Sequence, residues 1–385
     1  MKEPISIASF SSISSLGNSS RSVWNNYLQT NHFLVTKDFG KFSAPVSAIS
    51  HAINKEVEAF RNSDNKYKDL DRSVLLAMYV SRRALEKVSW DRSFGVNMGS
   101  SRGATELFES YYDAFQSDSF GRTETLTSPT TTLGNIASWV AHDLQTEGPA
   151  ISHSITCSTA LHSLLNGVAW MRSGMADTFL VGGSEAPLTA FTVAQMKALK
   201  IYAKQEETKY PCRAFDLSKK KNSMVLGEGA VAICLEKGIS KNSLALISGV
   251  GYATEKLKHN ISISSDALCF QKSMRMALQD ANLKTVDAIV MHAPGTIKGD
   301  LSEHKAIQNV FGTELPALTT NKWKIGHTLG ASGVLSMELA LLMLEHQQFI
   351  PVPFLETNKT PKKINSVLIN AVGFGGNAVS ILLVK

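Results

Sequence analysis

Residues Ile151–Arg172, ISHSITCSTALHSLLNGVAWMR, combine the pattern of a strand with the pattern of a helix. Its first part, Ile151–Thr156, is short and contains β-branched residues, which predicts a strand, while Thr159–Arg172 has the length and apolar spacing of a helix. Cys157 stands between them among small residues, so its sulfur is expected at a sharp turn and at the helix N-terminus. There the helix dipole and the free N–H groups favour a thiolate, and a buried structural cysteine is the alternative interpretation.

The same alternation of strand and helix patterns continues in both directions along the chain. It predicts an α/β fold built in layers, with the apolar strands Glu228–Leu235 and Leu244–Tyr252 pairing at its centre. The second part of the chain repeats the scheme of the first, which indicates a twofold duplication with a seam near residues 238–242. The other strands are expected at Ile5–Ala8, Phe94–Met98, Thr178–Val181, Ala288–Met291, Val367–Val372 and Ala378–Val384. The helices are expected at Arg21–Gln29, Leu70–Val88, Ala104–Phe115, Thr132–Gln145, Phe270–Gln279, Leu301–Phe311 and Thr328–His346.

The composition is that of an ordinary globular protein, with 43% hydrophobic and 19% charged residues among 385. The formal net charge of +6 suits an acidic partner, and the absence of a basic stripe interleaved with aromatic residues argues against nucleic acid. The N-terminal residues lack the apolar core of a signal peptide, and the apolar helix pattern at Val334–Leu344 is too short to span a bilayer. The four cysteines show no disulfide or metal-ligand spacing, so we expect a reducing, cytoplasmic location and no bound metal.

A histidine within a run of small residues marks the stretch Lys322–Gly333, KWKIGHTLGASG. Small residues permit close helix packing and close approach of a ligand, and an imidazole donates to a developing oxyanion or moves a proton. The sequence therefore makes His327 a candidate catalytic residue. A histidine that only caps a helix or lies satisfied in the core is the alternative.

Two further stretches carry residues that suit a functional site. The first is His292–Glu303, HAPGTIKGDLSE, where a strand ends at His292 and the carboxylates suit a helix start. The second is the loop Gly373–Asn377, GFGGN, whose glycines permit positive φ and close approach of backbone N–H groups to a ligand. The alternatives are a strand-end histidine bonded to the backbone and a tight hairpin between two strands.

The order and spacing of these stretches resemble the β-ketoacyl-[acyl carrier protein] synthases of fatty acid and polyketide synthesis, over nearly the whole chain. The likeness extends to Ser15–Asn18 with Trp24, and to Ala214–Asp216 followed by Gly227–Ala230. The resemblance implies the thiolase fold, a duplicated five-layered α-β-α-β-α arrangement. Its N-terminal half would be residues 1–238 and its C-terminal half residues 239–385.

The resemblance also implies catalytic roles for the residues at matching positions. Cys157 would be the nucleophile that carries the acyl chain as a thioester. His327 would help to stabilise the enolate formed when malonyl carrier protein loses carbon dioxide. Lys322 would give structural and electrostatic support, paired with Glu303.

Further roles that the resemblance implies concern the pocket wall. The backbone N–H groups of Cys157 and Phe374 would form the oxyanion hole. Phe374, which Gly373 and Gly375 flank in the sequence, would gate the entrance of the pocket. Substrate binding, including contact with the phosphopantetheine arm, would fall to Thr296 and Thr328.

One stretch departs from the family's pattern. The family has a histidine directly before Gly-Thr, where this chain has Pro294, and the nearest histidine, His292, lies two residues earlier. Lys298 stands where a second pantetheine-binding threonine is usual. We expect either that His292 takes the catalytic place in a remodelled loop or that the site works with one histidine. The departure indicates a divergent, secondary-metabolism branch rather than housekeeping fatty acid elongation.

The activity implied by the resemblance is decarboxylative Claisen condensation of an acyl thioester on Cys157 with malonyl carrier protein. No cofactor is bound, because phosphopantetheine arrives on the acyl carrier protein, and a homodimer or a heterodimer with a chain-length factor is expected. The alternative is a chain-length-factor-like, non-condensing subunit, which Cys157 argues against and Pro294 favours. A thiolase would need a further cysteine near the terminal glycine loop, and a cysteine hydrolase would leave Gly227–Gly229 without a role.

Overall fold

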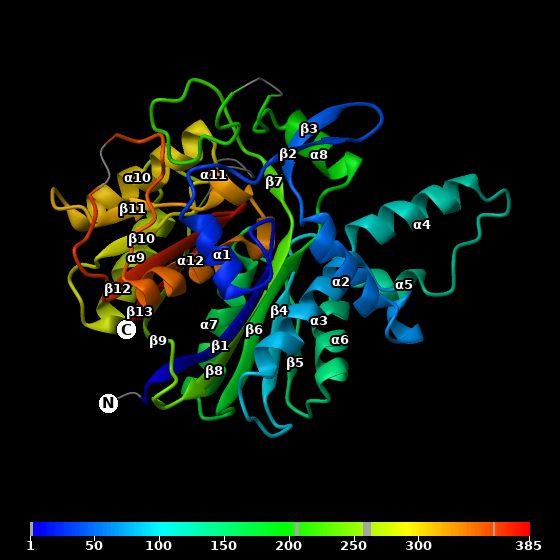
Figure 1. Cartoon of the computed structure of the whole chain (residues 1–385), viewed down its shortest axis with the longest axis horizontal. Coiled ribbons are helices and arrows are strands. Elements are labelled where there is room, and N and C mark those ends of the chain that lie inside the picture. Colours follow the sequence, from blue (N-terminus) through cyan, green and yellow to red (C-terminus); the bar gives the residue numbers. More distant parts are fainter. Residues whose placement is uncertain (1–2, 205–207, 257–262, 357–358) are drawn as a thin grey trace.

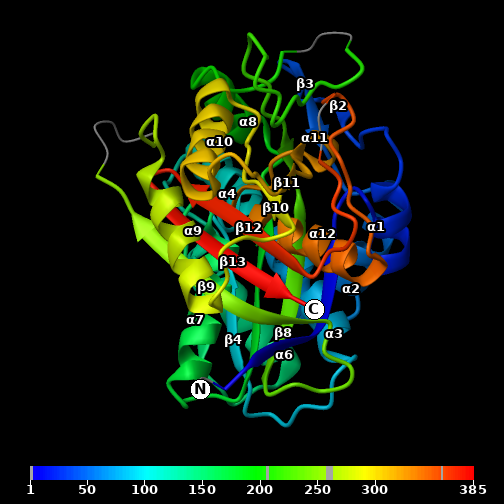
Figure 2. The same ribbon diagram turned by 90° about the vertical axis from the view of Figure 1, so that its left-hand side faces the viewer.

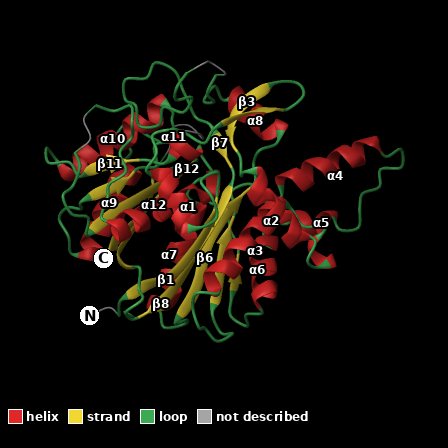
Figure 3. Cartoon of the chain, viewed as in Figure 1, coloured by secondary structure: helices red, strands yellow, loops and turns green. Residues whose placement is uncertain are grey.

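The chain folds around one long sheet and a small second sheet (Figure 1, Figure 3). The computed structural model describes residues 3–204, 208–256, 263–356 and 359–385. The strands are β1 Ile5–Ile13, β2 Val35–Asp38, β3 Ser43–Ser47, β4 Gly95–Gly99, β5 Ala150–Ile151, β6 Thr178–Glu185, β7 Leu226–Gly227, β8 Gly229–Lys237, β9 Ala245–Thr254, β10 Ala288–Val290, β11 Ala317–Thr319, β12 Ser366–Gly373 and β13 Asn377–Val384. The α-helices are α1 Ser20–Tyr27, α2 His51–Arg61, α3 Arg72–Leu85, α4 Thr105–Ser117, α5 Thr127–Thr131, α6 Asn135–Leu144, α7 Thr159–Arg172, α8 Ala190–Ala198, α9 Leu268–Ala281, α10 Ile297–Phe311, α11 Lys322–Ile325 and α12 Ser332–His346. Short 3₁₀ turns lie at Asn65–Tyr67 and Leu329–Ala331.

The ten-stranded sheet consists of two halves with the same strand order. One half runs β1-β8-β6-β4-β5 and the other runs β9-β13-β12-β10-β11. In each half the first three strands pair antiparallel and the last two add in parallel. The halves meet where β1 and β9 pair, at Ser6↔Leu246 and Ile7↔Ala245. This repeated order confirms the predicted duplication, and the exact division between residues 238 and 239 stays a prediction.

The predicted pairing of Glu228–Leu235 with Leu244–Tyr252 is wrong. These segments form β8 and β9, and β1 lies between them and pairs with both. Strand β1 is buried at every position except Ala8. A strand covered on both faces belongs in the interior of a sheet, so β1 separates two segments that are neighbours in sequence.

Alternating side chains along the strands divide the apolar core into clusters on opposite faces of each half-sheet. In β8, Val231 and Ile233 join the cluster in the middle of the molecule, whereas Ala232 and Cys234 join the cluster beneath α3 and α6. Strands β12 and β13 alternate in the same way between the middle cluster and a third cluster beneath α9 and α10. This period of two is what a strand covered on both faces requires, and it produces the predicted five layers.

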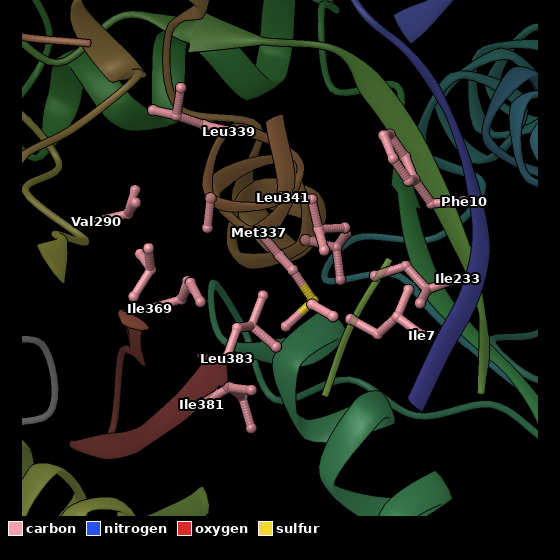
Figure 4. Close-up of a cluster of buried hydrophobic side chains, with 14 of the residues drawn as sticks. Ile7, Phe10, Ile233, Val290, Met337, Leu339, Leu341, Ile369, Ile381 and Leu383 are labelled. Carbon is pink, nitrogen blue, oxygen red and sulfur yellow. The ribbon is translucent and has the colours of Figure 1, made fainter. Parts of the chain in front are cut away.

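Helices α7 and α12 pack on each other in the middle layer, with the outer helices α9 and α10 in front in Figure 2. Figure 4 shows Met337 of α12 among side chains of the surrounding strands, with Ile7, Ile233 and Leu383 close by. Within the described residues, Leu329–His346 is the one helical stretch long and apolar enough to cross a membrane, and 89% of it is buried inside the molecule. Its position is that of a core helix, as the sequence predicted for this region.

One segment projects from the layered body, and we call it the arm. It comprises residues 105–131, with α4, the connection after it and α5 (Figure 1). Several of its large apolar side chains are exposed, among them Phe108 at 61%, Tyr112 at 55% and Phe120 at 78%. These aromatic side chains form an apolar surface that the rest of the described chain does not cover.

The predicted strand Ile151–Thr156 is shorter in the structure, because β5 ends at Ile151. The hydroxyl of Ser152 donates to the carbonyls of Met98 at 3.0 Å and Leu133 at 2.9 Å, so side-chain bonds to the backbone replace the sheet ladder here. The other predicted elements are present with shifted ends.

Candidate active site

One pocket gathers most of the residues singled out in the sequence. Its volume is about 390 Å³, and Cys157, His292, Thr296, His327 and Phe374 line it. Cys157 comes from the first repeat of the fold and the other four come from the second. The rest of the wall is largely apolar and includes Met196, Ile201, Met224, Ile263, Phe270, Leu329 and Val372. An apolar cavity with a few convergent polar groups suits a mostly apolar substrate.

Cys157 lies at the turn into α7, with 6% of its surface exposed. Thr156 before it has a φ of +46°, a left-handed conformation that turns the chain sharply. Burial and the nearby charge of Glu185 raise the pKa of the Cys157 thiol to about 12, against the lowering effects of Lys322 and Arg102. Desolvation is the largest of these effects, so burial favours the thiol over the thiolate that the sequence led us to expect.

The imidazoles of His292 and His327 are neighbours in the pocket. Their ring centroids lie 5.1 Å apart and the rings are nearly perpendicular, at 85°. Burial lowers the pKa of both rings well below 6.5, and the charge of Lys322 lowers it further. In both rings Nδ1 is buried without a hydrogen-bond partner in the part of the chain that the structure describes. Both imidazoles are therefore neutral at pH 7, and each offers one N–H donor and one accepting nitrogen.

A buried carboxylate holds the segment that carries His292. Glu303 accepts hydrogen bonds from the backbone N–H groups of His292 at 2.9 Å and Ala293 at 2.7 Å, and from Nδ2 of Asn370 at 3.3 Å. Glu303 thus anchors the backbone of a neighbouring loop instead of capping its own helix. The anchored loop brings His292 into the pocket, although Pro294 stands at the position where the resembling family has its histidine.

The predicted pairing of Lys322 with Glu303 is wrong as a direct contact. Lys322 is buried, and its Nζ has no hydrogen-bond partner among the residues described. Burial lowers the pKa of Lys322 and raises that of Glu303, while the attraction between their charges opposes both shifts. Lys322 therefore acts on the two imidazoles through its charge and not through a hydrogen bond.

The connection between β12 and β13 lies against the turn that carries Cys157. A Cβ on Gly373 would lie 1.8 Å from Oγ1 of Thr156, so only glycine fits there. The Thr156 hydroxyl also donates to the carbonyl of Phe374 at 3.4 Å. Gly375 has a φ of +96° and does not line the pocket, whereas Phe374 does, with 40% of its surface exposed. The loop thus lies against Thr156, the residue directly before Cys157, and Phe374 lines the same pocket as Cys157.

The two predicted substrate-binding threonines lie in different environments. Thr296 lines the pocket and is also the N-cap of α10, where its Oγ1 accepts from the N–H of Gly299 at 3.1 Å. This cap explains why α10 begins at Ile297, earlier than predicted. Thr328 does not line the pocket, and its buried Oγ1 has no partner among the described residues. A Cβ added to Gly227 would lie 3.0 Å from the methyl group of Thr328, so Thr328 packs against that glycine.

One buried acid near Cys157 was not anticipated from the sequence. Glu185 ends β6, whereas the predicted strand ended at Val181 because Gly182 and Gly183 suggested a break. The glycines instead let β6 approach its neighbours, since a Cβ on Gly182 would lie 2.1 Å from the Val231 carbonyl oxygen. A strand pattern extended through the glycine pair is the signal that would have found this residue.

Family models match both parts of the chain. Residues 2–239 match the beta-ketoacyl synthase N-terminal domain, and residues 244–356 match the C-terminal domain. Among curated proteins, the chain is 25% identical over 405 residues to 3-oxoacyl-[acyl-carrier-protein] synthase 2 of Staphylococcus aureus, covering 97% of this chain and 99% of that protein. It is 27% identical over 368 residues to nodulation protein E of Rhizobium sp. (strain N33), covering 88% of this chain and 89% of that protein.

Solved structures share the fold over the whole chain. A beta-ketoacyl synthase from Burkholderia phymatum STM815 superposes with a TM-score of 0.87 at 21% identity, covering 100% of this chain and 99% of that one. The ishigamide ketosynthase/chain length factor superposes with a TM-score of 0.87 at 20% identity, covering 100% of both chains. Because the N-terminal family model alone spans more than half of its residues, this chain belongs to the beta-ketoacyl synthase family.

Proposed function

We propose that this chain is a β-ketoacyl-[acyl carrier protein] synthase that performs decarboxylative condensation in fatty acid or polyketide synthesis. The observation that carries the proposal is that Cys157, His292 and His327 line one pocket although they come from opposite repeats. A sulfur nucleophile beside two neutral imidazoles is what acyl transfer followed by carbanion chemistry needs. Relatives named as 3-oxoacyl-[acyl-carrier-protein] synthases support the same class of acyltransferase.

In the first half-reaction, Cys157 takes up the acyl chain. The sulfur attacks the thioester carbonyl while the neutral imidazole of His327 accepts the thiol proton. The backbone N–H groups of Cys157 and Phe374 donate to the tetrahedral oxyanion. The C–S bond to pantetheine then breaks, and the proton passes to the leaving sulfur. The products are an acyl thioester on Cys157 and a free carrier protein.

In the second half-reaction, a malonyl thioester enters the pocket. Its carboxylate leaves as carbon dioxide, and the electrons of the broken C–C bond form an enolate. The N–H groups of His292 and His327 donate to the enolate oxygen, so His292 supplies the second imidazole in spite of Pro294. The enolate carbon attacks the acyl carbonyl, and the sulfur of Cys157 leaves as a thiolate that takes up a proton.

The substrate is delivered on the phosphopantetheine arm of an acyl carrier protein. Thr296 supports this assignment, because its hydroxyl lines the pocket and keeps a hydrogen to donate after capping α10. Lys298 is exposed and lines the same pocket, which suits the acidic surface of a carrier protein, as does the net charge of +6. Structural relatives include a type II polyketide ketosynthase in complex with its acyl-carrier protein.

The chain pairs with a second ketosynthase-type chain in the cytoplasm, either a copy of itself or a chain-length factor. The exposed aromatic side chains of the arm support such a partner. The structural relatives also include a ketosynthase, ApeO, in complex with its chain length factor, ApeC, from Xenorhabdus doucetiae.

A second candidate function is a non-condensing subunit of the chain-length-factor type. Pro294, at the usual histidine position, is the observation that favours it. Cys157 beside the two imidazoles favours the condensing enzyme, because a subunit that only shapes a partner's tunnel needs no nucleophile.

Mass spectrometry of the protein incubated with acyl carrier protein and malonyl carrier protein substrates tests the proposal. We expect an acyl mass on Cys157 that is lost in Cys157→Ala and retained in Cys212→Ala. Cys212 is a matched control because it is also buried, with a pKa raised to about 12. Absence of acylation with any chain length would instead support the non-condensing subunit.

A further inference from the structure

We infer that Glu185 is a positioning residue of the nucleophile pocket, whose carboxylate fastens two loops around Cys157 and whose charge opposes formation of the thiolate. The inference rests on the proposed role of Cys157 as the nucleophile. It adds a protonation-dependent control of that sulfur by an acid that neither half-reaction uses.

Geometry supports the fastening role of Glu185. Its side chain is fully buried, and Oε1 accepts hydrogen bonds from the backbone N–H of Ser101 and, at 3.2 Å, from that of Gly330. Ser101 follows β4, and Gly330 lies three residues after His327. A Cβ on Gly330 would lie 2.7 Å from Oε1, so the contact depends on glycine. One carboxylate oxygen therefore ties the loop that carries His327 to the end of β4.

The charge of Glu185 is compensated only in part, because Arg102 and the Ser100 side chain lower its pKa against the larger effect of burial. Oε2 is buried without a hydrogen-bond partner among the described residues. The cation that acts on Glu185 is Arg102, whose guanidinium donates to Oε1 of Gln195 at 2.6 Å and lowers the pKa of both Glu185 and Cys157. Lys322 also acts on the thiol, and the two pocket imidazoles are neutral. The negative charge that faces Cys157 is thus that of Glu185.

Protonation of Glu185 changes near neutral pH. Burial raises its pKa to about 7, so the carboxyl is neutral below that pH and anionic above it. An anion beside a thiol disfavours the thiolate. As the pH rises through about 7, the thiolate fraction of Cys157 therefore increases by less than the usual tenfold per pH unit.

The experiment measures alkylation of Cys157 by iodoacetamide between about pH 6 and pH 9, read as the mass of the Cys157 peptide. The variant is Glu185→Gln, which keeps the accepting oxygen and removes the charge. The matched control is Glu338→Gln. Glu338 is also fully buried with an unpartnered Oε2 and a pKa raised to about 7, but it bonds to Ser12 and does not act on Cys157. Each variant places an amide NH₂ where a buried Oε2 had no hydrogen-bond partner, so the two substitutions should change the free energy of unfolding by similar amounts.

We expect Glu185→Gln to be alkylated on the order of tenfold faster than the native chain above pH 8, with a steeper pH profile, and Glu338→Gln to follow the native profile. Glu303 and Lys322 titrate in all three proteins and cancel in the comparison. A Glu185→Gln profile that superposes on the native one would overturn the inference. Iodoacetamide needs no carrier protein, so a shifted profile without any acylation would refute the proposed function while still showing that the charge of Glu185 acts on the Cys157 thiol.

A second variant keeps the inference testable if Glu185→Gln does not fold. Arg102→Gln removes the cation that favours ionised Glu185, and Arg102 lies partly at the surface. We expect the shallow part of the alkylation profile to move to higher pH in this variant. If the region of reduced slope lies at the same pH in this variant as in the native chain, a group other than Glu185 causes it.

Discussion

Burial keeps the reactive side chains of the pocket in their neutral forms. Cys157 is a thiol because its pKa is about 12, and the imidazoles of His292 and His327 are uncharged because burial and Lys322 both lower their pKa. A neutral thiol loses its proton only as it attacks, so a nearby accepting nitrogen has a direct task in acylation. In the proposed second half-reaction, the same neutral rings would donate to the enolate oxygen of the malonyl substrate.

Replacement of His292 separates the two half-reactions. We expect His292→Ala to retain acylation of Cys157, because His327 remains to accept the proton, and to slow condensation by about 10²–10⁴-fold. Acylation is measured by mass spectrometry of the protein, and condensation by the mass of the 3-oxoacyl carrier protein that forms. His346→Ala is the control, since His346 stacks on Trp24 away from the pocket. Condensation at the native rate would reduce His292 to a structural residue.

Motifs located the pocket residues from the sequence, but not their charge states. Cys157 and His327 stand at junctions with helices, where small residues and glycines mark the position locally. The protonation of Cys157 depends on Glu185 and Lys322, which are far apart in sequence and meet only through the fold. The anchoring role of Glu303 was hidden for the same reason, since a carboxylate near a helix start predicts a cap before it predicts a bond to a neighbouring loop.

At the scale of elements, the glycine loop depends on contact with the turn before Cys157. Sequence patterns predicted the loop and both of its strands, because glycine clusters and β-branched runs are local signals. They could not predict that β1 lies between β8 and β9. Pairing between strands that are distant in sequence depends on how the helices pack on the sheet, and local patterns do not show this. The predicted start of α10 at Leu301 was also too late, because the cap at Thr296 lets the helix begin at Ile297.

Gly373→Ala tests the contact between the loop and the turn. The added Cβ would meet Oγ1 of Thr156 at 1.8 Å, so we expect acylation to fall by at least about tenfold and unfolding to become easier by roughly 1–3 kcal/mol. Thr156→Ala should restore part of both in the double variant, because it removes the clashing hydroxyl oxygen while the Ile155 carbonyl oxygen stays 2.7 Å from the added Cβ. Gly134→Ala is the control, since nothing lies within 4 Å of its Cβ position. A double variant no better than Gly373→Ala would place the damage elsewhere.

Glu338 makes the stability of helix α12 depend on pH in an uncommon direction. Burial raises its pKa from 4.5 to about 7, so it binds a proton more tightly in the folded chain. The stability it contributes is complete below pH 4.5 and is lost as the pH rises through 7. We expect urea unfolding to show that Glu338→Gln gains up to about 3 kcal/mol relative to the native chain between pH 5 and pH 8. A difference that is constant with pH would mean that Glu338 has an ordinary pKa when folded.

At the scale of the whole molecule, the arm is the part that the layered body does not explain. Helices α3, α6, α9 and α10 cover the two half-sheets, and α7 and α12 fill the space between them. Residues 105–131 add little to that core and present aromatic side chains outward. The sequence predicted the first helix of the arm but not its exposure, because apolar spacing alone does not tell whether the covering surface belongs to the same chain.

Polar substitutions on the arm test whether it binds a second chain. We expect the pair Phe108→Ser and Tyr112→Ser to lower the mass measured by light scattering toward that of a monomer, while the melting temperature of the body is nearly unchanged. Met175→Ser is the control, because Met175 is 65% exposed but lies outside the arm. An unchanged mass would mean that the arm is free in the assembled protein.

Burial of Cys157 has a consequence for chemical damage as well as for catalysis. Peroxides oxidise thiolates and react slowly with thiols, and the oxidised sulfenic acid can proceed to irreversible products. A sulfur that stays protonated at rest is therefore a poor target in a cell under oxidative stress. Under the proposed function, the environment that keeps the thiol protonated at rest thus also protects the atom that would carry the acyl chain.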